Sequence, residues 1–127
     1  MIHWHFARRK LQQSKGFTLL ELLVVVAVLG TLAAIAIQQF AIYRNRVIDT
    51  QMRSALKSAA IAMESYFADF QSYPSSVTGI TTVGYRPTSG VALTINVTSN
   101  TTFTLSASKP SGTQASFSFD SVTGLIN

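Results

Sequence analysis

A long apolar segment near the start of the chain constrains the fold more than any other feature. Residues 17–37 begin with Phe17 and are otherwise Leu, Val, Ala and Ile almost throughout, with Thr18, Glu21, Gly30 and Thr31 as the only interruptions of the apolar run. As a helix with a rise of about 1.5 Å per residue, this segment is about 31 Å long, which matches a bilayer hydrocarbon core of about 30 Å. The segment is therefore predicted to be a helix that can span a membrane.

Glu21 is the one carboxylate in this segment. An unpaired charge inside a bilayer costs about 2 to 3 kcal/mol or more, so Glu21 needs a cationic partner. Cleavage of the peptide bond between Gly16 and Phe17 would supply one, because the new α-amino group of Phe17 lies about one helical turn from Glu21 and carries the opposite charge. The role of the segment thus depends on whether the chain is cut after Gly16.

The residues around this junction resemble a known family. Gly16 is followed by Phe-Thr-Leu-Leu-Glu, a run of Leu, Val and Ala, then Gly30 and Leu-Ala-Ala-Ile-Ala-Ile at residues 32–37. This pattern resembles the class III signal peptide and N-terminal helix of bacterial type IV pilins and pseudopilins. The family often has a proline next, where this chain has Gln38. Because proline bends or breaks a helix, local melting is less expected here than in relatives that have it.

The resemblance implies a role for each matched position. A membrane prepilin peptidase is expected to cut after Gly16 and to methylate the amine of Phe17, and Glu21 is expected to pair with that amine in a neighbouring subunit. The filament core is expected to be packed by apolar side chains of the same helix, namely Leu20, Leu23, Val24, Ala27, Val28, Leu32 and Ile35. The implied partners are a homopolymer of the chain, the prepilin peptidase, the inner-membrane pilus assembly platform, and the membrane before assembly.

Two simpler explanations of the apolar segment were weighed. An ordinary secretory signal has a basic start and a small-residue cleavage site, which residues 34–36 resemble, but its apolar stretch is shorter and lacks a residue like Glu21. A plain single-pass anchor explains the membrane-length span. It explains neither the junction of Gly16 and Phe17 nor Glu21.

The basic character of the chain is concentrated in residues 1–16. This leader holds four of the ten Lys and Arg residues and none of the five acids, so the rest of the chain is nearly neutral. A nearly neutral chain has little electrostatic attraction to nucleic acid, and no specific nucleic-acid partner is predicted. The two histidines, His3 and His5, also lie in the leader and are interpreted as part of a solvated tail rather than as metal ligands.

Residues 38–72 continue the helix with an amphipathic pattern. Apolar residues recur at steps of three and four, which is typical of a helix with one buried face. They are Val47 or Ile48, Met52, Ala55, Leu56, Ala59, Met63, Tyr66, Phe67 and Phe70. Asp49 and Arg53 are expected to form an i,i+4 ion pair. The helix is predicted to run from about Phe17 to about Phe70, because Pro74 disfavours helix at the preceding residue.

The last part of the chain is predicted to be a small sheet. Residues 73–90 are expected to form an ordered connecting loop, with a short strand as an option. Residues 91–127 then show three stretches of alternating apolar and polar residues, at 91–97, 102–107 and 115–119, separated by turn-forming residues. A three-stranded sheet cannot build its own core, so its apolar face should pack on the amphipathic helix. Leu125 and Ile126 are expected to return as a short edge strand.

The residues argue against catalysis and against a cofactor. The chain has no cysteine, so disulfides, thiolate metal sites and cysteine nucleophiles are excluded. Asp69 and Asp120 were considered as metal ligands with loop carbonyls, but a solvated or capping role is favoured because no acidic cluster of calcium-site density occurs. No nucleophile, base and orienting group recur at a recognisable spacing, so no enzyme, metal or cofactor is predicted.

The sequence therefore predicts an α+β protein with five parts. They are a cleaved leader (1–16), a membrane and filament-core helix (17–37), an amphipathic helix (38–72), a loop (73–90) and an antiparallel sheet (91–127). The predicted function is that of a major type IV pilin, held in the inner membrane and then assembled into an extracellular surface filament for adhesion, motility or DNA uptake. The alternatives are a minor pilin, a pseudopilin of a secretion or competence system, and a membrane-anchored binding module that does not polymerise.

Overall fold

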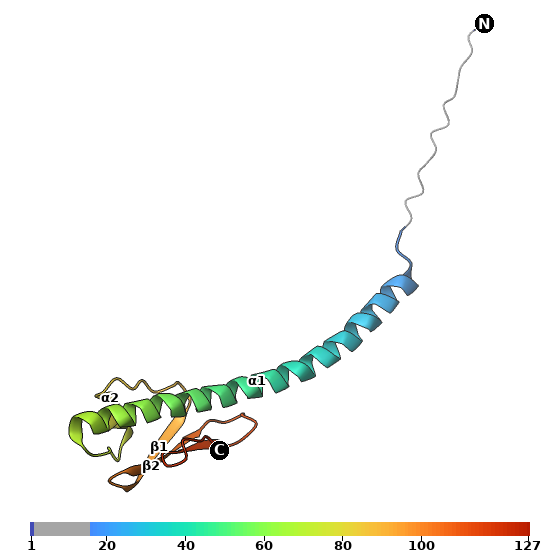
Figure 1. Cartoon of the computed structure of the whole chain (residues 1–127). Coiled ribbons are helices and arrows are strands. Elements are labelled where there is room, and N and C mark those ends of the chain that lie inside the picture. The colour runs from blue at the N-terminus through green and yellow to red at the C-terminus, as the bar shows by residue number, and fades with distance from the viewer. Residues whose placement is uncertain (2–15) are drawn as a thin grey trace. The chain divides into compact units, whose positions relative to one another are not determined.

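A computed structural model of the chain describes Met1 and residues 16–127, so His3, His5 and the basic residues of the leader lie outside the described residues. The elements follow the order α1 (Leu19–Phe70), α2 (Val77–Thr81), β1 (Ala92–Ser99), β2 (Thr102–Ser108) and β3 (Ser116–Asp120) (Figure 1). The chain divides into two compact units, Met1–Ile37 and Gln38–Asn127, and α1 contributes to both. A long N-terminal helix and a three-stranded antiparallel sheet confirm the predicted α+β class.

Local sequence accounts for both ends of α1. At its start, the backbone N–H of Glu21 donates to the hydroxyl of Thr18 at 3.1 Å, which is half of the capping box that the spacing Thr-x-x-Glu favours. The helix continues without interruption through Gln38. It ends at Phe70, where Gln71 adopts the left-handed conformation (φ 54°) and donates its N–H to the carbonyl of Phe67 at 2.8 Å.

The chain reverses direction after α1 around Tyr73. Its ring lies 4.7 Å from the ring of Phe67 on α1 and 4.7 Å from the ring of Phe103 on β2, so it joins the helix to the sheet. Its hydroxyl donates to the carboxylate of Glu64 at 3.1 Å. Burial, with the bond to Glu64 as a second cause, raises the pKa of the Tyr73 phenol above its ordinary value.

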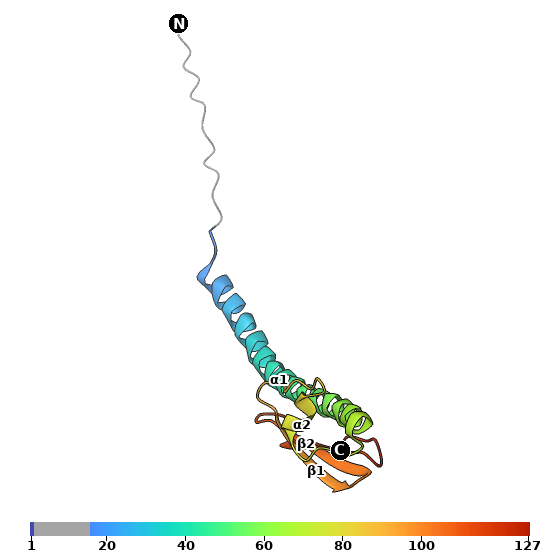
Figure 2. The ribbon, with the colours of Figure 1, turned by 90° about the vertical axis from the view of Figure 1, so that its left-hand side faces the viewer.

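The core of the second unit lies between the amphipathic half of α1 and the inner face of the sheet (Figure 2). The helix contributes Ile48, Met52, Leu56, Ala59, Ala62 and Met63, and the sheet contributes Phe103, Leu105, Ala107 and Phe117. The three- and four-residue steps of the helix and the alternation of the strands produce these two matching faces. Phe70, expected in the helical stripe, is instead 58% exposed because the helix ends there, beyond the core.

The sheet is a meander of order β1-β2-β3, antiparallel throughout, as the alternating pattern predicted. The free edge of β3 is covered by the end of the chain. Ser118 and Asn127 exchange two backbone hydrogen bonds of 2.8 and 2.9 Å, and Ile126 bridges to Phe119. The returning edge strand expected at Leu125 and Ile126 is thus reduced to a single bridge.

The segment between helix and sheet differs from its prediction as a loop. It contains the short helix α2, and the prediction of an optional short strand in this segment was wrong. The side chain of Ile80 in α2 is fully buried in the core. Gly79 faces Pro74, and a β-carbon at Gly79 would lie 2.5 Å from that of Pro74. The sequence Val-Thr-Gly-Ile-Thr has low intrinsic helix propensity, so we attribute the stability of this helical turn to the burial of Ile80.

The loop between β2 and β3 is attached to α1 by polar contacts. Asp49 accepts a hydrogen bond from the backbone N–H of Thr113 at 2.8 Å and a second from its hydroxyl. The sequence predicts an ion pair between Asp49 and Arg53, but in the structure both groups have other partners. The Arg53 guanidinium lies over the ring of Phe117, 4.3 Å from its centre. The ammonium of Lys109 donates to Gln51 on α1 at 2.7 Å.

Candidate functional site

The first half of α1 is apolar on every side, and its side chains are exposed. From Leu19 to Ile37 no residue is buried within the chain. The helix is long and apolar enough to cross a membrane. The seven residues predicted to pack a filament core, Leu20, Leu23, Val24, Ala27, Val28, Leu32 and Ile35, all lie exposed on this segment. An apolar surface of this kind is unfavourable in water, and it is stabilised when another apolar phase covers it.

The junction between Gly16 and Phe17 lies just before this helix. Residues 16–18 are in neither helix nor strand, and both residues of the junction are exposed, Phe17 by 81%. A β-carbon built on Gly16 would meet no other atom within 4 Å. The scissile bond proposed from the sequence therefore lies in exposed, non-helical backbone. Proteases preferentially cleave backbone of this kind.

Glu21 lies in the first turn of α1 and is exposed. A carboxylate at this end of a helix interacts favourably with the positive end of the helix dipole. Within residues 16–37 there is no Lys or Arg side chain to pair with it. Sequence reasoning assigned Glu21 a partner but missed the capping role of Thr18, although the spacing Thr-x-x-Glu was the signal for it.

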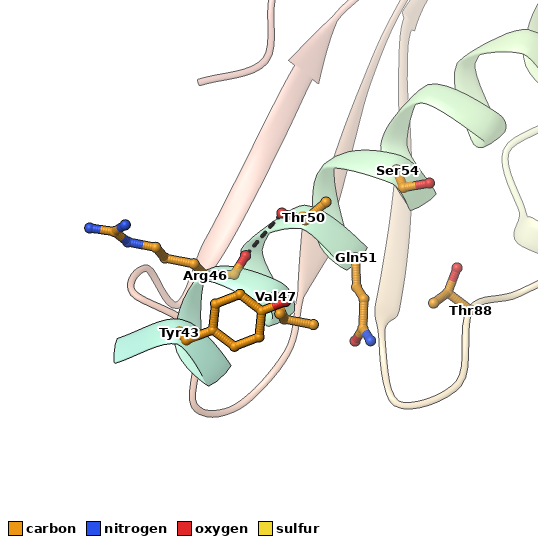
Figure 3. A pocket seen from close by; sticks show the side chains of 7 residues that line it. All are labelled: Tyr43, Arg46, Val47, Thr50, Gln51, Ser54 and Thr88. Carbon is orange, nitrogen blue, oxygen red and sulfur yellow. Dashed lines mark hydrogen bonds between the residues drawn. The ribbon is translucent and has the colours of Figure 1, made fainter. Parts of the chain in front are cut away.

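An open groove lies on the second unit, beside α1 (Figure 3). It has a volume of about 610 Å³ and is lined by Tyr43, Arg46, Val47, Thr50, Gln51 and Ser54 of α1, with Thr88 facing them from the segment before β1. Tyr43 and Val47 give it an apolar wall, whereas the guanidinium of Arg46 points away from Thr88. None of the seven lining residues is a carboxylate, histidine or cysteine, so the groove offers a contact surface rather than a nucleophile with its base.

The two carboxylates considered as metal ligands lie on different elements, Asp69 on α1 and Asp120 at the end of β3. The side chain of Asp120 accepts the backbone N–H of Val122 at 2.7 Å, which is a turn-capping role. Asp69 is exposed on α1. Within residues 16–127 no group of three or more Asp, Glu, His or Cys residues is placed to hold a metal ion.

Comparison with known proteins identifies the family. Residues 11–37 match the family model described as the prokaryotic N-terminal methylation motif. The chain is also 32% identical over 111 residues to the type IV major fimbrial protein FimA of Dichelobacter nodosus, a match that covers 81% of this chain and 71% of that protein. The chain belongs to the type IV pilin superfamily. The predicted resemblance is confirmed.

Other members of the superfamily match over a shorter part of the chain. The type IV wide pilus major component PilA4 of Thermus thermophilus is 36% identical over 78 residues, which cover 61% of this chain and 60% of that protein. The type II secretion system core protein G of Pseudomonas aeruginosa is 35% identical over 77 residues, covering 61% of this chain and 54% of that protein. The chain thus spans little more than half the length of these two relatives. They are named for pili and for secretion, and the lack of an enzymatic activity stays a prediction.

Proposed function

We propose that the chain is the precursor of a major type IV pilin, cut after Gly16 and assembled through residues 17–37 into a surface filament. One observation carries the proposal. The second unit builds its whole core from residues of its own, the first of which is Ile48, while every side chain from Leu19 to Ile37 is left exposed. The apolar helix is therefore available for burial outside its own chain, first in a bilayer and then among copies of itself.

Assembly from membrane to filament exchanges one apolar environment for another. Lipid tails are as apolar as Leu and Val, so burial of the helix among its copies gains little hydrophobic free energy. Specific contacts must then favour the filament. The charge pair between Glu21 and the methylated amine of Phe17 in a neighbouring subunit is one such contact, and it fixes one axial register because both charges are otherwise unpaired in an apolar core. A repeated head-to-tail contact of this kind does not close on itself, and it yields a fibre.

The partners and locations follow from this sequence of events. A membrane prepilin peptidase removes residues 1–16 and methylates Phe17, and the inner-membrane assembly platform extracts the mature subunit. The precursor and the unassembled subunit lie in the inner membrane, and the filament lies outside the cell. Support for these steps comes from the match to the N-terminal methylation motif, from the helix of membrane-spanning length and from relatives named as pilus components.

A second candidate function is that of a pseudopilin, which forms a short periplasmic structure instead of a surface fibre. The 35% identity to a type II secretion system core protein favours it. The match to FimA extends over more of the chain, 81% against 61%, and this favours the surface pilin. The two functions share the cleavage, the helix and Glu21, and they differ in where the assembled chain is found.

Glu21→Gln is the most direct test of the proposed function, because it removes the charge and keeps the size of the side chain and one of its two acceptor oxygens. The filament yield in material sheared from cells is expected to fall sharply, with normal cleavage after Gly16 and a normal fold of the second unit, Gln38–Asn127, which we call the head. Glu64→Gln is the matched control, since it removes the other glutamate of α1, which lies exposed in the second unit. Wild-type filament yield from Glu21→Gln would refute the pairing of Glu21 with the amine.

A further inference from the structure

The outer edge of β1, residues 92–99, is the least protected part of the sheet. β1 pairs with β2 on one side only, and β3 forms the opposite edge. The end of the chain covers β3 through the backbone bonds between Ser118 and Asn127 and between Asp120 and Leu125. Within residues 16–127, no backbone hydrogen bond outside the β1–β2 ladder reaches β1. The sheet therefore has one edge that the end of the chain pairs with and one open edge, whose outward backbone groups have no backbone partner among the described residues, although α2 also contacts β1.

The open edge has few of the usual devices against strand pairing. Natural edge strands are commonly protected by lysine, proline or inward-pointing charges, and residues 91–99 contain no charged residue and no proline. The inward-facing Leu93, Ile95 and Val97 remain partly exposed, whereas their counterparts on β2 are fully buried. One protective feature exists, a register irregularity between Val97 and Ser99. It limits the regular edge to residues 92–97.

We propose that the outer edge of β1 pairs antiparallel with the same edge of a second copy of the chain. Each chain has a single open edge, so pairing about a two-fold axis satisfies both edges at once and closes the contact. No charge on either strand opposes the approach. Pairing supplies partners for the outward backbone groups and covers Leu93, Ile95 and Val97 more fully.

The pairing geometry makes a specific prediction about neighbours. In a continuous sheet, residues on the same face lie opposite one another, so Thr94 of one copy faces Thr94 or Asn96 of the other within residues 92–97. Directly opposed residues in an antiparallel pair have β-carbons about 4.5 to 5.5 Å apart, close to the separation that a disulfide spans.

The inference rests on the proposed function for its consequence in the cell. Subunits of one head-to-tail filament all point the same way, so a two-fold contact joins subunits of two different filaments. The edge of β1 would then be a site of lateral association between filaments. The pairing itself does not require a filament and can be measured on the full chain in detergent.

Cysteine cross-linking tests the pairing cleanly, because the chain has no cysteine of its own. The variants are Thr94→Cys and Asn96→Cys, each alone and the two mixed, in purified full-length chain. Ser118→Cys is the matched control, because Thr94, Ser106 and Ser118 form one cross-strand row and Ser118 is exposed on the covered edge. Two thiols held opposite one another react at an effective concentration of about millimolar, roughly a hundredfold above a chain at about 10 µM.

The expected result is a covalent dimer on mild oxidation for at least one of the three β1 samples and little dimer for Ser118→Cys. Adding Ala92→Lys and Thr98→Lys, two exposed positions of β1, to the sample that cross-links places like charges opposite or diagonal to one another across the pair and is expected to abolish the dimer without changing the circular dichroism spectrum. Cross-linking of β1 no faster than of Ser118→Cys, or unchanged by the two added lysines, would overturn the proposal.

The same variants separate this inference from the proposed function. In cells, Ala92→Lys with Thr98→Lys is expected to leave single filaments intact and to reduce their lateral bundling under the electron microscope. Cells that express the Thr94→Cys and Asn96→Cys chains and make filaments, but show no cross-link through β1, would refute the edge pairing alone. A cross-linked dimer from cells that make no filament would refute the filament function alone.

Discussion

At the scale of single residues, Asp49 shows how one side chain fixes a distant loop. It lies on α1 and accepts two hydrogen bonds from Thr113, which is 64 residues further along the chain. Gly112 lies so close that a β-carbon there would be 2.7 Å from the Asp49 carboxylate and 2.9 Å from the end of the Met52 side chain. A chain without cysteine thus attaches the loop between β2 and β3 to the helix by a carboxylate rather than by a disulfide.

The charge of Asp49 is expected to make the stability of the head depend on pH. The hydrogen bond from the Thr113 hydroxyl, followed by bonds from backbone N–H groups, lowers the pKa of Asp49 below its ordinary value of 3.8. A pKa that is lower in the folded than in the unfolded state adds stability above the unfolded value, and this is lost as the pH falls below about 3.8. Thermal unfolding of the full chain in detergent between pH 7 and pH 3 measures the effect.

Asp49→Asn is expected to lower the melting temperature at pH 7 and to flatten its fall in acid. Asp69→Asn is the matched control, because Asp69 is an exposed acid on the same helix. It should reproduce the acid profile of the unaltered chain. An Asp49→Asn variant with the full acid dependence would show that other carboxylates are responsible.

Gly16 gives a second prediction at the scale of single residues. A bulky residue at the cleavage site, as in Gly16→Val, is expected to block processing without affecting the fold, because a β-carbon at Gly16 meets no other atom within 4 Å. Mass spectrometry of the membrane fraction should then show the precursor mass. A mature mass that begins at Phe17 would contradict the assignment of the cleavage site.

At the scale of elements, regular patterns were predictable and contacts between distant segments were not. The three- and four-residue steps indicated the buried face of α1, and the alternation of Phe103, Leu105 and Ala107 indicated the inner face of β2, because periodicity reports which side of an element is buried. α2 escaped prediction because five residues are too few to show a helical period and its stability comes from the burial of Ile80.

The candidate site was predictable to a similar extent. The apolar helix, Glu21 and the junction of Gly16 and Phe17 follow from one continuous stretch of sequence. The contact between Asp49 and Thr113 could not be found in this way, since Arg53 is the nearer partner for Asp49 in sequence and only the folded chain brings Thr113 to it. The open edge of β1 likewise required the strand order.

The packing of α1 on the sheet gives a prediction at this scale. Leu56 is fully buried between helix and sheet, and Leu56→Ala is expected to lower the free energy of unfolding by about 2 to 5 kcal/mol through lost burial and a residual cavity. Ile61 lies on the same helix but is 71% exposed, so Ile61→Ala should change it by no more than about 0.5 kcal/mol. Denaturant unfolding of the full chain in detergent measures both. Equal effects of the two changes would contradict the assigned core.

At the scale of the whole molecule, the chain combines a head that buries its own core with a helix whose apolar side chains, at residues 19–37, are all exposed. The head buries Met52, Leu56, Phe103 and Phe117 without help from residues 17–37. Those residues are apolar enough to span a bilayer. They also include Glu21, whose charged carboxylate is costly to bury in a bilayer without a partner. Such a chain suits the two environments that the proposed function gives it in turn, the membrane and a filament of its own copies.

The measurement that tests this account most directly is the intact mass and N-terminal sequence of the chain in two fractions of the native cell. One fraction is material sheared from the surface, and the other is the membrane. The account predicts that the sheared material forms thin filaments whose subunits begin with methylated Phe17. Cleaved chain found only in the membrane would favour the pseudopilin, and a chain still intact at Met1 in both fractions would contradict the cleavage, the role of Glu21 and the filament together.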